Sequence, residues 1–364
     1  MPMSEKENVE YTVYDEKTRR AVLELVGERF DAANVHAIER LLDNPLRRER
    51  PAAGDVVLVD GKAVLFSAMI AKRACLDGKE YEVSVGGSFS KAATGCPSEY
   101  LLDVFDLTRS AGASTDLLVG NTCIYRVAQL AKMCGWTKGP SSWEATRYAV
   151  LRPALFAALV VWRKVFHRAQ PSAAPLRPAC LGKTYAARAG LAVRREREVD
   201  KAALDVFWRN YLASSRGLVL SRTAEELDWL FGEFVGNGTA ALLTLRRGET
   251  VEGYVVVRRM ADSPRRWRVM DLIALSDDEE RLELLLRGAK RFLSREADAI
   301  TLEITGFPDR VQQLLGRLFP FVRKGGHNPF AWIARRAESS DRLKAALIAQ
   351  DGWFFGPYDG DYSL

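Results

Sequence analysis

Hydrophobic and polar residues alternate along several short runs of the chain, which is the pattern of a strand with two unlike faces. In the run YEVSVGG, Tyr81, Val83 and Val85 fall on one side, and Glu82 and Ser84 fall on the other. The run AITLEITG, in the last third of the chain, alternates in the same way. Both runs therefore predict strands.

Other segments repeat their hydrophobic residues at every third or fourth position, as an amphipathic helix does. The clearest one begins at Asp278 and has apolar residues at helical intervals: Leu282, Leu285, Leu286, Ala289, Phe292 and Leu293. This segment predicts a long helix with one buried face.

The same order of elements occurs twice along the chain. The first half predicts helices at 18–30 and 35–42, strands at 55–61, 62–76 and 79–87, a helix at 97–111, a strand at 115–121 and a helix at 122–136. The second half predicts helices at 200–214 and 224–235, strands at 239–248, 250–260 and 266–275, a helix at 278–297, a strand at 298–306 and a helix at 310–319. The chain, with 364 residues, is also too long for a typical single core. We therefore expect two domains, at 1–148 and 184–364, with a connecting segment at 149–183.

The connecting segment opens with a basic, apolar stretch and ends in a proline-rich linker. A helix is predicted from Pro153, with four apolar residues on one face: Leu155, Leu159, Trp162 and Phe166. Basic residues lie on the other side or at the border: Arg152, Arg163, Lys164, His167 and Arg168. The apolar run is too short to span a bilayer. The favoured interpretation is a bridge packed on both domains, and the alternative is a helix at residues 152–168 that contacts a membrane peripherally.

The amino-acid composition favours certain kinds of binding partner and a certain cellular compartment. The net charge of +6 suits an anionic partner, such as a cofactor phosphate or a membrane surface, although an arginine-rich proteome gives the same charge. The five cysteines show no zinc-like spacing, and with three histidines no metal site is predicted. The polar N-terminus lacks the apolar core of a secretion signal. We expect a cytoplasmic protein, with the inner face of a membrane as the alternative contact.

The repeated order of elements resembles the GNAT acyltransferase fold, present twice as in tandem GNAT and Fem-like proteins. The closest local match is DLLVGNTCIYRVAQLAKMCGW, in which Asn121 and the pair Gly135–Trp136 are similar to the family's strand, asparagine, helix and glycine-aromatic ending. The resemblance implies an α/β (α+β) fold with two GNAT-like domains, each a mixed, mostly antiparallel sheet flanked by helices. This sequence departs from the family's pattern at two features. The acyl-CoA loop, usually Arg/Gln-x-x-Gly-x-Gly/Ala, is KAATGC here, and the helix tyrosine falls near Ala131.

The resemblance implies that acetyl-CoA or a longer acyl-CoA binds where the central strand of the first half turns into a helix. Small residues in SKAATGCPSE let the backbone approach a diphosphate at a helix N-terminus. The implied cofactor-binding residues are Phe89, Ser90, Lys91, Thr94, Gly95, Cys96, Ser98 and Asn121. The matched turn of the second half is acidic, SDDEERLE, and predicts a capping box between Ser276 and Glu279. Such a turn repels a diphosphate, so we expect no acyl-CoA there.

Four residues are candidates for acid–base chemistry: Asp271, Glu303, Glu82 and Tyr125. Asp271 lies on an apolar strand face, which raises a carboxyl pKa, unless an arginine pairs with it or a bulge turns it outward. Glu303 lies on a polar face that either lines a cleft or is simply solvated. Tyr125 is earlier on the helix that carries the family's general acid.

The aromatic tail DGWFFGPYDGDYSL is too apolar to be left wholly in solvent. We expect its aromatic residues to anchor it on the rest of the protein, with two acids near an acceptor or with a purely stabilising role: Trp353, Phe354, Phe355, Tyr358, Asp359 and Asp361. Cys96 and Cys123 have no histidine close in sequence and are better explained as packing residues than as nucleophiles.

These features favour an acyl-CoA-dependent N- or O-acyltransferase with an amine- or hydroxyl-bearing acceptor. The resemblance suggests an amino sugar of a surface polysaccharide or of its lipid-linked precursor. The alternatives are a non-catalytic GNAT-like binding or scaffold protein and a Fem-like aminoacyl transferase. Nucleic acid is not expected as a partner, because no basic stripe interleaved with aromatic residues stands out.

Overall fold

The computed structural model describes residues 8–28, 30, 32–47, 53–93, 100, 115–123, 129, 132–133, 135–138, 145–166, 176, 183–215, 217–260, 263–297, 299–324, 328–333, 340–348 and 353–354. The elements up to the connecting segment are β1 (Val9–Val13), α1 (Arg19–Gly27), α2 (Ala32–Glu39), the short turn η1 (Arg40–Asp43), β2 (Gly54–Val59), β3 (Lys62–Leu76), β4 (Lys79–Lys91), β5 (Leu117–Cys123), β6 (Thr137–Lys138), β7 (Ala145–Val150) and α5 (Pro153–Phe166). The later elements are β8 (Thr184–Arg188), β9 (Leu191–Arg195), α6 (Lys201–Ser214), β10 (Leu218–Leu220), α7 (Ala224–Gly236), β11 (Ala240–Arg247), β12 (Thr250–Met260), β13 (Ser263–Ala274), η4 (Leu275–Asp277), α8 (Glu279–Glu296), β14 (Thr301–Thr305), α9 (Asp309–Leu318), β15 (Phe321–Lys324), β16 (Asn328–Ile333), α10 (Ser340–Ile348) and β17 (Trp353–Phe354).

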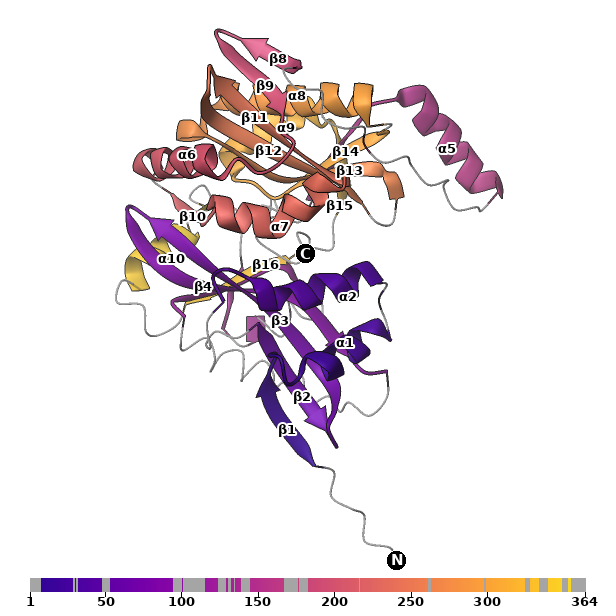
Figure 1. The fold of residues 1–364 in the computed structure, drawn as a ribbon, viewed down its shortest axis with the longest axis vertical. Helices are drawn as coiled ribbons and strands as arrows, with labels where there is room; N and C mark the ends of the chain where they lie inside the picture. The colour runs from indigo at the N-terminus through magenta and orange to yellow at the C-terminus, as the bar shows by residue number, and fades with distance from the viewer. Residues whose placement is uncertain are drawn as a thin grey trace, which may run out of the picture.

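These elements form two mixed sheets flanked by helices, which confirms the predicted fold class (Figure 1). The first sheet has the order β1-β2-β3-β4-β5-β16-β6, and β10 pairs with the end of β3. The second sheet has the order β15-β7-β14-β13-β12-β11-β9-β8. Each sheet contains one parallel pair within its central run, β4 with β5 and β13 with β14, and is otherwise antiparallel along that run.

Helices pack on both sheets and bury their apolar side chains. In the first half, Val83 and Val85 of β4 are buried together with Val22 and Leu25 of α1. In the second half, α6 and α7 lie between the sheet and the first half, and α8 lies on the opposite face (Figure 1). The second sheet is therefore covered on both faces, and all five residues of β14, polar and apolar alike, are buried.

Strands are exchanged between the halves: the second sheet contains β7 of the first half, and the first sheet contains β10, β16 and β17 of the second half. β7 comes from the first half of the chain but lies between β14 and β15 of the second sheet. β16 comes from the second half but lies between β5 and β6 of the first sheet. The predicted domain boundary at residue 148 falls inside β7, so the two sheets do not follow that boundary in the sequence.

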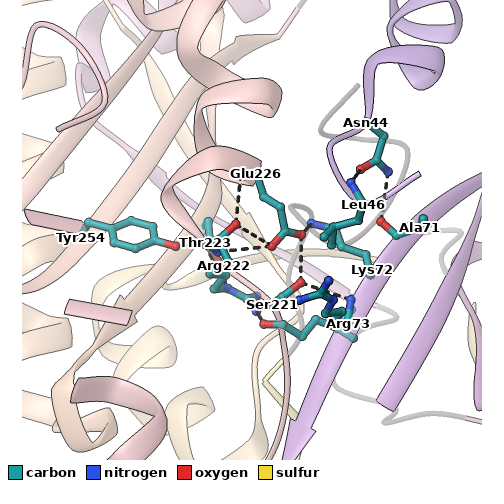
Figure 2. Close-up of polar contacts among 12 residues, drawn as sticks. Asn44, Leu46, Ala71, Lys72, Arg73, Ser221, Arg222, Thr223, Glu226 and Tyr254 are labelled. Carbon is teal, nitrogen blue, oxygen red and sulfur yellow. Dashed lines mark hydrogen bonds and ion pairs between the residues drawn. The ribbon is translucent and has the colours of Figure 1, made fainter. Parts of the chain in front are cut away.

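A buried polar cluster joins the two halves where β3 meets the start of α7 (Figure 2). Lys72 Nζ of β3 donates to Glu226 Oε1 of α7 at 3.1 Å, and both side chains are buried. Ser221 Oγ donates to the same carboxylate oxygen at 2.9 Å, and its backbone N–H donates to Arg73 O at 2.7 Å. Glu226 also forms a capping box with Thr223 at the N-terminus of α7. The carboxylate of Glu226 thus caps the N-terminus of α7 and also neutralises a lysine of the other half.

Helix α5 follows β7 and stands away from the second sheet (Figure 1). None of the residues from 153 to 162 is buried, which differs from the packed bridge that the sequence favoured. The helix is held at its base, where Leu151 N–H donates to Ile300 O at 2.7 Å and Arg152 Nη2 donates to Ser294 O at 3.1 Å.

Candidate active site

The strongest candidate site is a fork between β4 and β5 in the first half. These two strands pair in parallel from Val83 with Leu117 to Gly86 with Gly120. The pairing ends there, although β4 continues to Lys91 and β5 continues to Cys123. Beyond the last pair, β4 remains bonded to β3, and β5 pairs on its other side with β16. The two strand edges that face each other across the fork have no pairing with each other in the described part of the chain.

A β-bulge lies in β4 directly after the last parallel pair. Met69 of β3 faces Gly86 and Ser67 faces Phe89, so that Gly87 and Ser88 together oppose the single residue Ala68. A bulge leaves one residue out of the hydrogen-bonded ladder and redirects the backbone. The bulge therefore lies directly beside the point where β4 and β5 part. The sequence predicts cofactor binding around Phe89 and Ser90, the two residues that directly follow the bulge.

Glycine occupies both sides of the fork at the point where the strands part. A Cβ atom on Gly86 would lie 3.6 Å from Val119 O, which is an ordinary van der Waals contact. The fold therefore has room for a side chain at Gly86, and packing alone does not require glycine there. Gly120 lies opposite Gly86, so the last parallel pair carries no side chain on either strand.

The second half has the same fork and bulge but fills them with charged side chains. β13 and β14 end their parallel pairing at Arg268 with Glu303. Val269 and Met270 then oppose the single residue Val257, in the same register as the bulge of the first half. Arg268 is thus the counterpart of Gly86, and Glu303 is the counterpart of Gly120. Arg268 Nη2 lies 3.6 Å from Glu303 Oε2, so an ion pair closes the second fork.

Arginines also hold Glu303 from its other sides. Arg266 donates to both carboxylate oxygens at 2.9 and 3.0 Å, and Arg323 Nη2 donates at 3.4 Å. Burial by itself raises the pKa of Glu303, but the hydrogen bonds and charges of Arg266, with the charges of Arg268 and Arg323, outweigh it and hold the pKa below its usual range. A carboxylate in this environment is a weak base, because it gives up its proton early.

Asp271 is the counterpart of Phe89 at the second bulge and is completely buried. Arg222 Nε lies 3.1 Å from both carboxylate oxygens, and the hydroxyl of Tyr254 donates to Oδ2 at 2.7 Å. Arg222 Nη1 also donates to Leu220 O at 2.7 Å, which fixes the guanidinium. Of the two interpretations made from the sequence, the structure shows the one in which an arginine pairs with Asp271.

Glu82 lies at the other end of β4, next to Arg73 in the strand register. It lines a small recess with Lys72, Arg73 and Thr115, on the side of the sheet that approaches the second half. Four residues of strand separate it from Gly86, which is about 13 Å at the usual rise of a strand. Glu82 is therefore remote from the fork.

The predicted cofactor-binding residues are only partly within the described structure. Phe89, Ser90 and Lys91 form the end of β4, and Asn121 lies in β5 just past Gly120, so that these four positions border the fork. The hydroxyl of Ser90 is buried and has no hydrogen-bond partner within the described structure. Four further positions, Thr94, Gly95, Cys96 and Ser98, and the candidate acid Tyr125, lie outside the described residues.

The matched turn of the second half is described, and one prediction about it was wrong. Helix α8 is capped by Asp278, whose Oδ1 accepts from Arg281 N–H at 2.8 Å, rather than by a box between Ser276 and Glu279. Ser276 instead has a left-handed φ of 60° in the turn η4. Asp277 accepts from the hydroxyl of Tyr211 at 2.9 Å. Carboxylates of the chain itself thus occupy this helix N-terminus.

The aromatic tail is described at only two positions. Trp353 and Phe354 form β17, whose backbone pairs in parallel with Leu218 and Val219 of β10. The tail strand therefore joins the sheet region where the two halves meet. Asp359 and Asp361 lie outside the described residues. Among the residues that are described, no group of three or more His, Cys, Asp or Glu side chains gathers as a metal site would.

Two mixed sheets of this order, each with a fork and a bulge at its central parallel pair, have the GNAT fold. A GCN5-related N-acetyltransferase from Anabaena variabilis superimposes with a TM-score of 0.56 at 10% identity, over 90% of this chain and 73% of that one. A probable N-acyltransferase of unknown function from Enterococcus faecalis gives 0.55 at 13% identity, over 90% and 73%. N-myristoyltransferase from Saccharomyces cerevisiae, solved with bound myristoyl-CoA, gives 0.54 at 13% identity, over 92% and 81%. No protein-family model and no curated protein sequence matches the chain.

Proposed function

We propose that the protein is an acyl-CoA-dependent acyltransferase whose acyl donor binds in the fork of the first half. The observation that carries the proposal is the contrast at matched positions. The last parallel pair of the first half is Gly86 with Gly120, which has no side chains, whereas the matched pair of the second half is Arg268 with Glu303, which forms an ion pair. Structures with the same fold include acetyl- and myristoyltransferases, which supports an acyl-CoA as the ligand.

The chemistry of the fork suits the pantetheine arm of an acyl-CoA. That arm is an extended chain with two amide groups, and an unpaired strand edge offers N–H and C=O groups at matching intervals. The bulge at Gly87 and Ser88 then supplies backbone N–H groups to the thioester carbonyl, which gains negative charge during acyl transfer. The turn that follows Lys91 would receive the pyrophosphate.

The reaction proposed at the fork is a direct transfer to an amine or hydroxyl. The acceptor nitrogen or oxygen attacks the thioester carbonyl carbon, and the carbon–sulfur bond breaks. The leaving thiolate takes a proton from the hydroxyl of Tyr125. The proton that the acceptor loses then restores this hydroxyl. In the sequence, Tyr125 follows Cys123, the last residue of β5, by two positions. We assign Asp271 and Glu303, both held by arginines, to the stability of the second half.

The acceptor proposed is an amino sugar of a surface polysaccharide or of its lipid-linked precursor, with the second half shaping the acceptor site. The basis for this class is the resemblance to tandem GNAT and Fem-like proteins. The exchanged strands support a joint site, because β16 places a strand of the second half beside β5 at the fork.

Calorimetric titration with acetyl-CoA and longer acyl-CoAs tests the donor site. We expect saturable binding that Gly86→Leu weakens at least tenfold, or by about 1.4 kcal/mol, because a side chain would fill the fork. The same variant should keep its melting temperature, since a Cβ atom at Gly86 makes no close contact. Gly236→Leu is the matched control, because a Cβ atom at that glycine of α7 meets nothing within 4 Å.

The titration also separates the alternatives. No binding with any acyl chain length would exclude the donor site and leave a GNAT-like scaffold. Normal binding by Gly86→Leu would place the donor outside the first fork. A third variant, Gly95→Glu, adds bulk and charge to the turn after β4, and undiminished affinity there would show that the pyrophosphate lies elsewhere.

A further inference from the structure

The first ten residues of helix α5 are apolar on every face of the helix, and yet none of them is buried. Its first ten residues include nine consecutive apolar ones, from Ala154 to Trp162. A helix without a polar face normally lies in a protein core or in lipid. Here no residue from 153 to 162 is buried, and the exposed fractions are 41% at Val160, 60% at Val161 and 42% at Trp162. Water is an unfavourable neighbour for this surface.

The charged residues in the stretch of sequence that contains α5 all have the same sign. The chain contains no Asp or Glu between Glu144 and Glu196, and it contains ten Arg or Lys residues in that interval. Arg163 and Lys164 follow the apolar residues within the helix itself. An apolar helix surface followed by basic residues is complementary to an anionic lipid surface, where the apolar side chains enter the acyl boundary and the cations meet the headgroups.

A second copy of the chain is a less suitable occupant. Pairing α5 with α5 would bring two acid-free segments together, each with its basic residues, and like charges would repel across the contact. The projection of α5 from the body suits a broad surface better than a groove (Figure 1). The helix is also firmly anchored, because its base is bonded to Ile300 and Ser294.

We propose that α5 docks the protein on the surface of an anionic lipid bilayer. The helix lies in the interface and does not cross it; no helix in the described ranges has the length and apolarity to span a membrane. Docking requires nothing of the acyl-transfer fork. It does bring the molecule to the surface where a lipid-linked acceptor resides.

Co-sedimentation with vesicles tests the docking. The probes are vesicles of phosphatidylcholine alone and vesicles with 30% phosphatidylglycerol, each titrated with the full-length chain. We expect binding to the anionic vesicles that is at least tenfold stronger than to the neutral ones and that falls when salt is raised, because salt screens the charges. The double variant Val161→Glu, Trp162→Glu should lose at least tenfold in binding. Val206→Glu is the matched control, since Val206 on α6 is 44% exposed and should not matter.

The outcomes are distinct. Absence of binding to anionic vesicles overturns the proposal, and so does equal binding by the wild type and the double variant. Light scattering on the same samples tests whether a second copy of the chain covers α5 instead. A wild-type dimer that becomes monomeric in the double variant, together with no vesicle binding, would show this and overturn the proposal. Acyl-CoA titration of the double variant should be unchanged, so failure of the docking and failure of the donor site are read from different experiments.

Discussion

Asp271 illustrates at the scale of one residue why a buried carboxylate is not automatically a catalytic one. Its carboxylate oxygens accept hydrogen bonds from Arg222 and Tyr254. The carboxylate and the guanidinium are both fully buried. Such a pair adds little net stability compared with apolar residues, but removal of one partner leaves the other charged and buried. The pair is therefore expected to matter for folding of the second half.

Arg222→Met should destabilise the protein by about 3–5 kcal/mol, because Asp271 is left without its counter-charge. The double variant Arg222→Met, Asp271→Leu should recover most of that loss, since no unpaired charge remains. Urea unfolding measures both. Arg20→Met is the control, because Arg20 pairs with Glu24 on the exposed face of α1, where solvent screens an ion pair and its contribution to stability is small. A loss at Arg222 as small as that at Arg20 would contradict the assignment.

Glu303 predicts a dependence of stability on pH. Its pKa is lower in the folded protein than the ordinary value of about 4.3. A carboxyl with a depressed folded pKa stabilises the protein above the unfolded pKa, and this contribution is lost as the pH falls through the folded pKa. Glu303→Gln should therefore have a lower melting temperature than the wild type at neutral pH, and the difference should shrink below about pH 4. Calorimetry from pH 7 to pH 2.5 measures the difference, and a difference independent of pH would contradict the prediction.

At the scale of single elements, local periodicity predicted well the long strands and helices that the structure describes; most residues of the helices predicted at 97–111 and 122–136 lie outside the described residues. The run from Lys62 to Leu76 was predicted at the bounds observed for β3, and α8 was predicted within one residue at each end. The prediction for β4 ended four residues early, at Gly87, because the bulge interrupts the alternation there. Short elements without strong alternation, including β7 and β16, were not predicted. Periodicity shows which face of a strand is buried but not which strand is its neighbour.

The candidate site depended on the same missing information. Glycine is visible in both YEVSVGG and LLVGN, and the sequence shows that each closes a strand. Only the register shows that Gly86 lies opposite Gly120, and that Arg268 and Glu303 occupy the same two places in the other half. The acidic turn after β13 was predicted to reject a diphosphate from charge alone. The structure identifies a different cap, Asp278, because the first residues of the turn take up a left-handed bend.

The exchanged strands predict how the chain behaves when it is divided. A fragment of residues 184–364 lacks β7, so its sheet has an open gap between β14 and β15. It should be insoluble when expressed alone, because the gap exposes two unpaired strand edges. Co-expression of 1–144 with 145–364 should give a soluble complex, since the second fragment has β7 for its own sheet and supplies β16 to the first. Co-purification through a tag on one fragment measures this, and a soluble, monomeric 184–364 would contradict it.

At the scale of the whole molecule, the two halves are coupled in three independent ways. Each sheet contains a strand from the other half, β10 of the second half pairs with β3, and Lys72 is neutralised by Glu226 (Figure 2). Any separation of the halves would expose strand edges and a buried ion pair at once. The 364-residue chain should therefore unfold in one cooperative transition, although a chain of this size often unfolds domain by domain.

Lys72→Met tests this coupling. The substitution leaves Glu226 buried without its counter-charge and should cost about 3 kcal/mol or more. If the halves are one unit, calorimetry will show a single transition that moves to lower temperature as a whole, with agreement between the calorimetric and van't Hoff enthalpies. Adding Glu226→Gln should recover part of the loss, because glutamine still accepts from Ser221 and still serves in a capping box without carrying a charge. Two separate transitions in Lys72→Met, with only one of them shifted, would mean that the ion pair stabilises one half alone and that the exchanged strands do not couple the two.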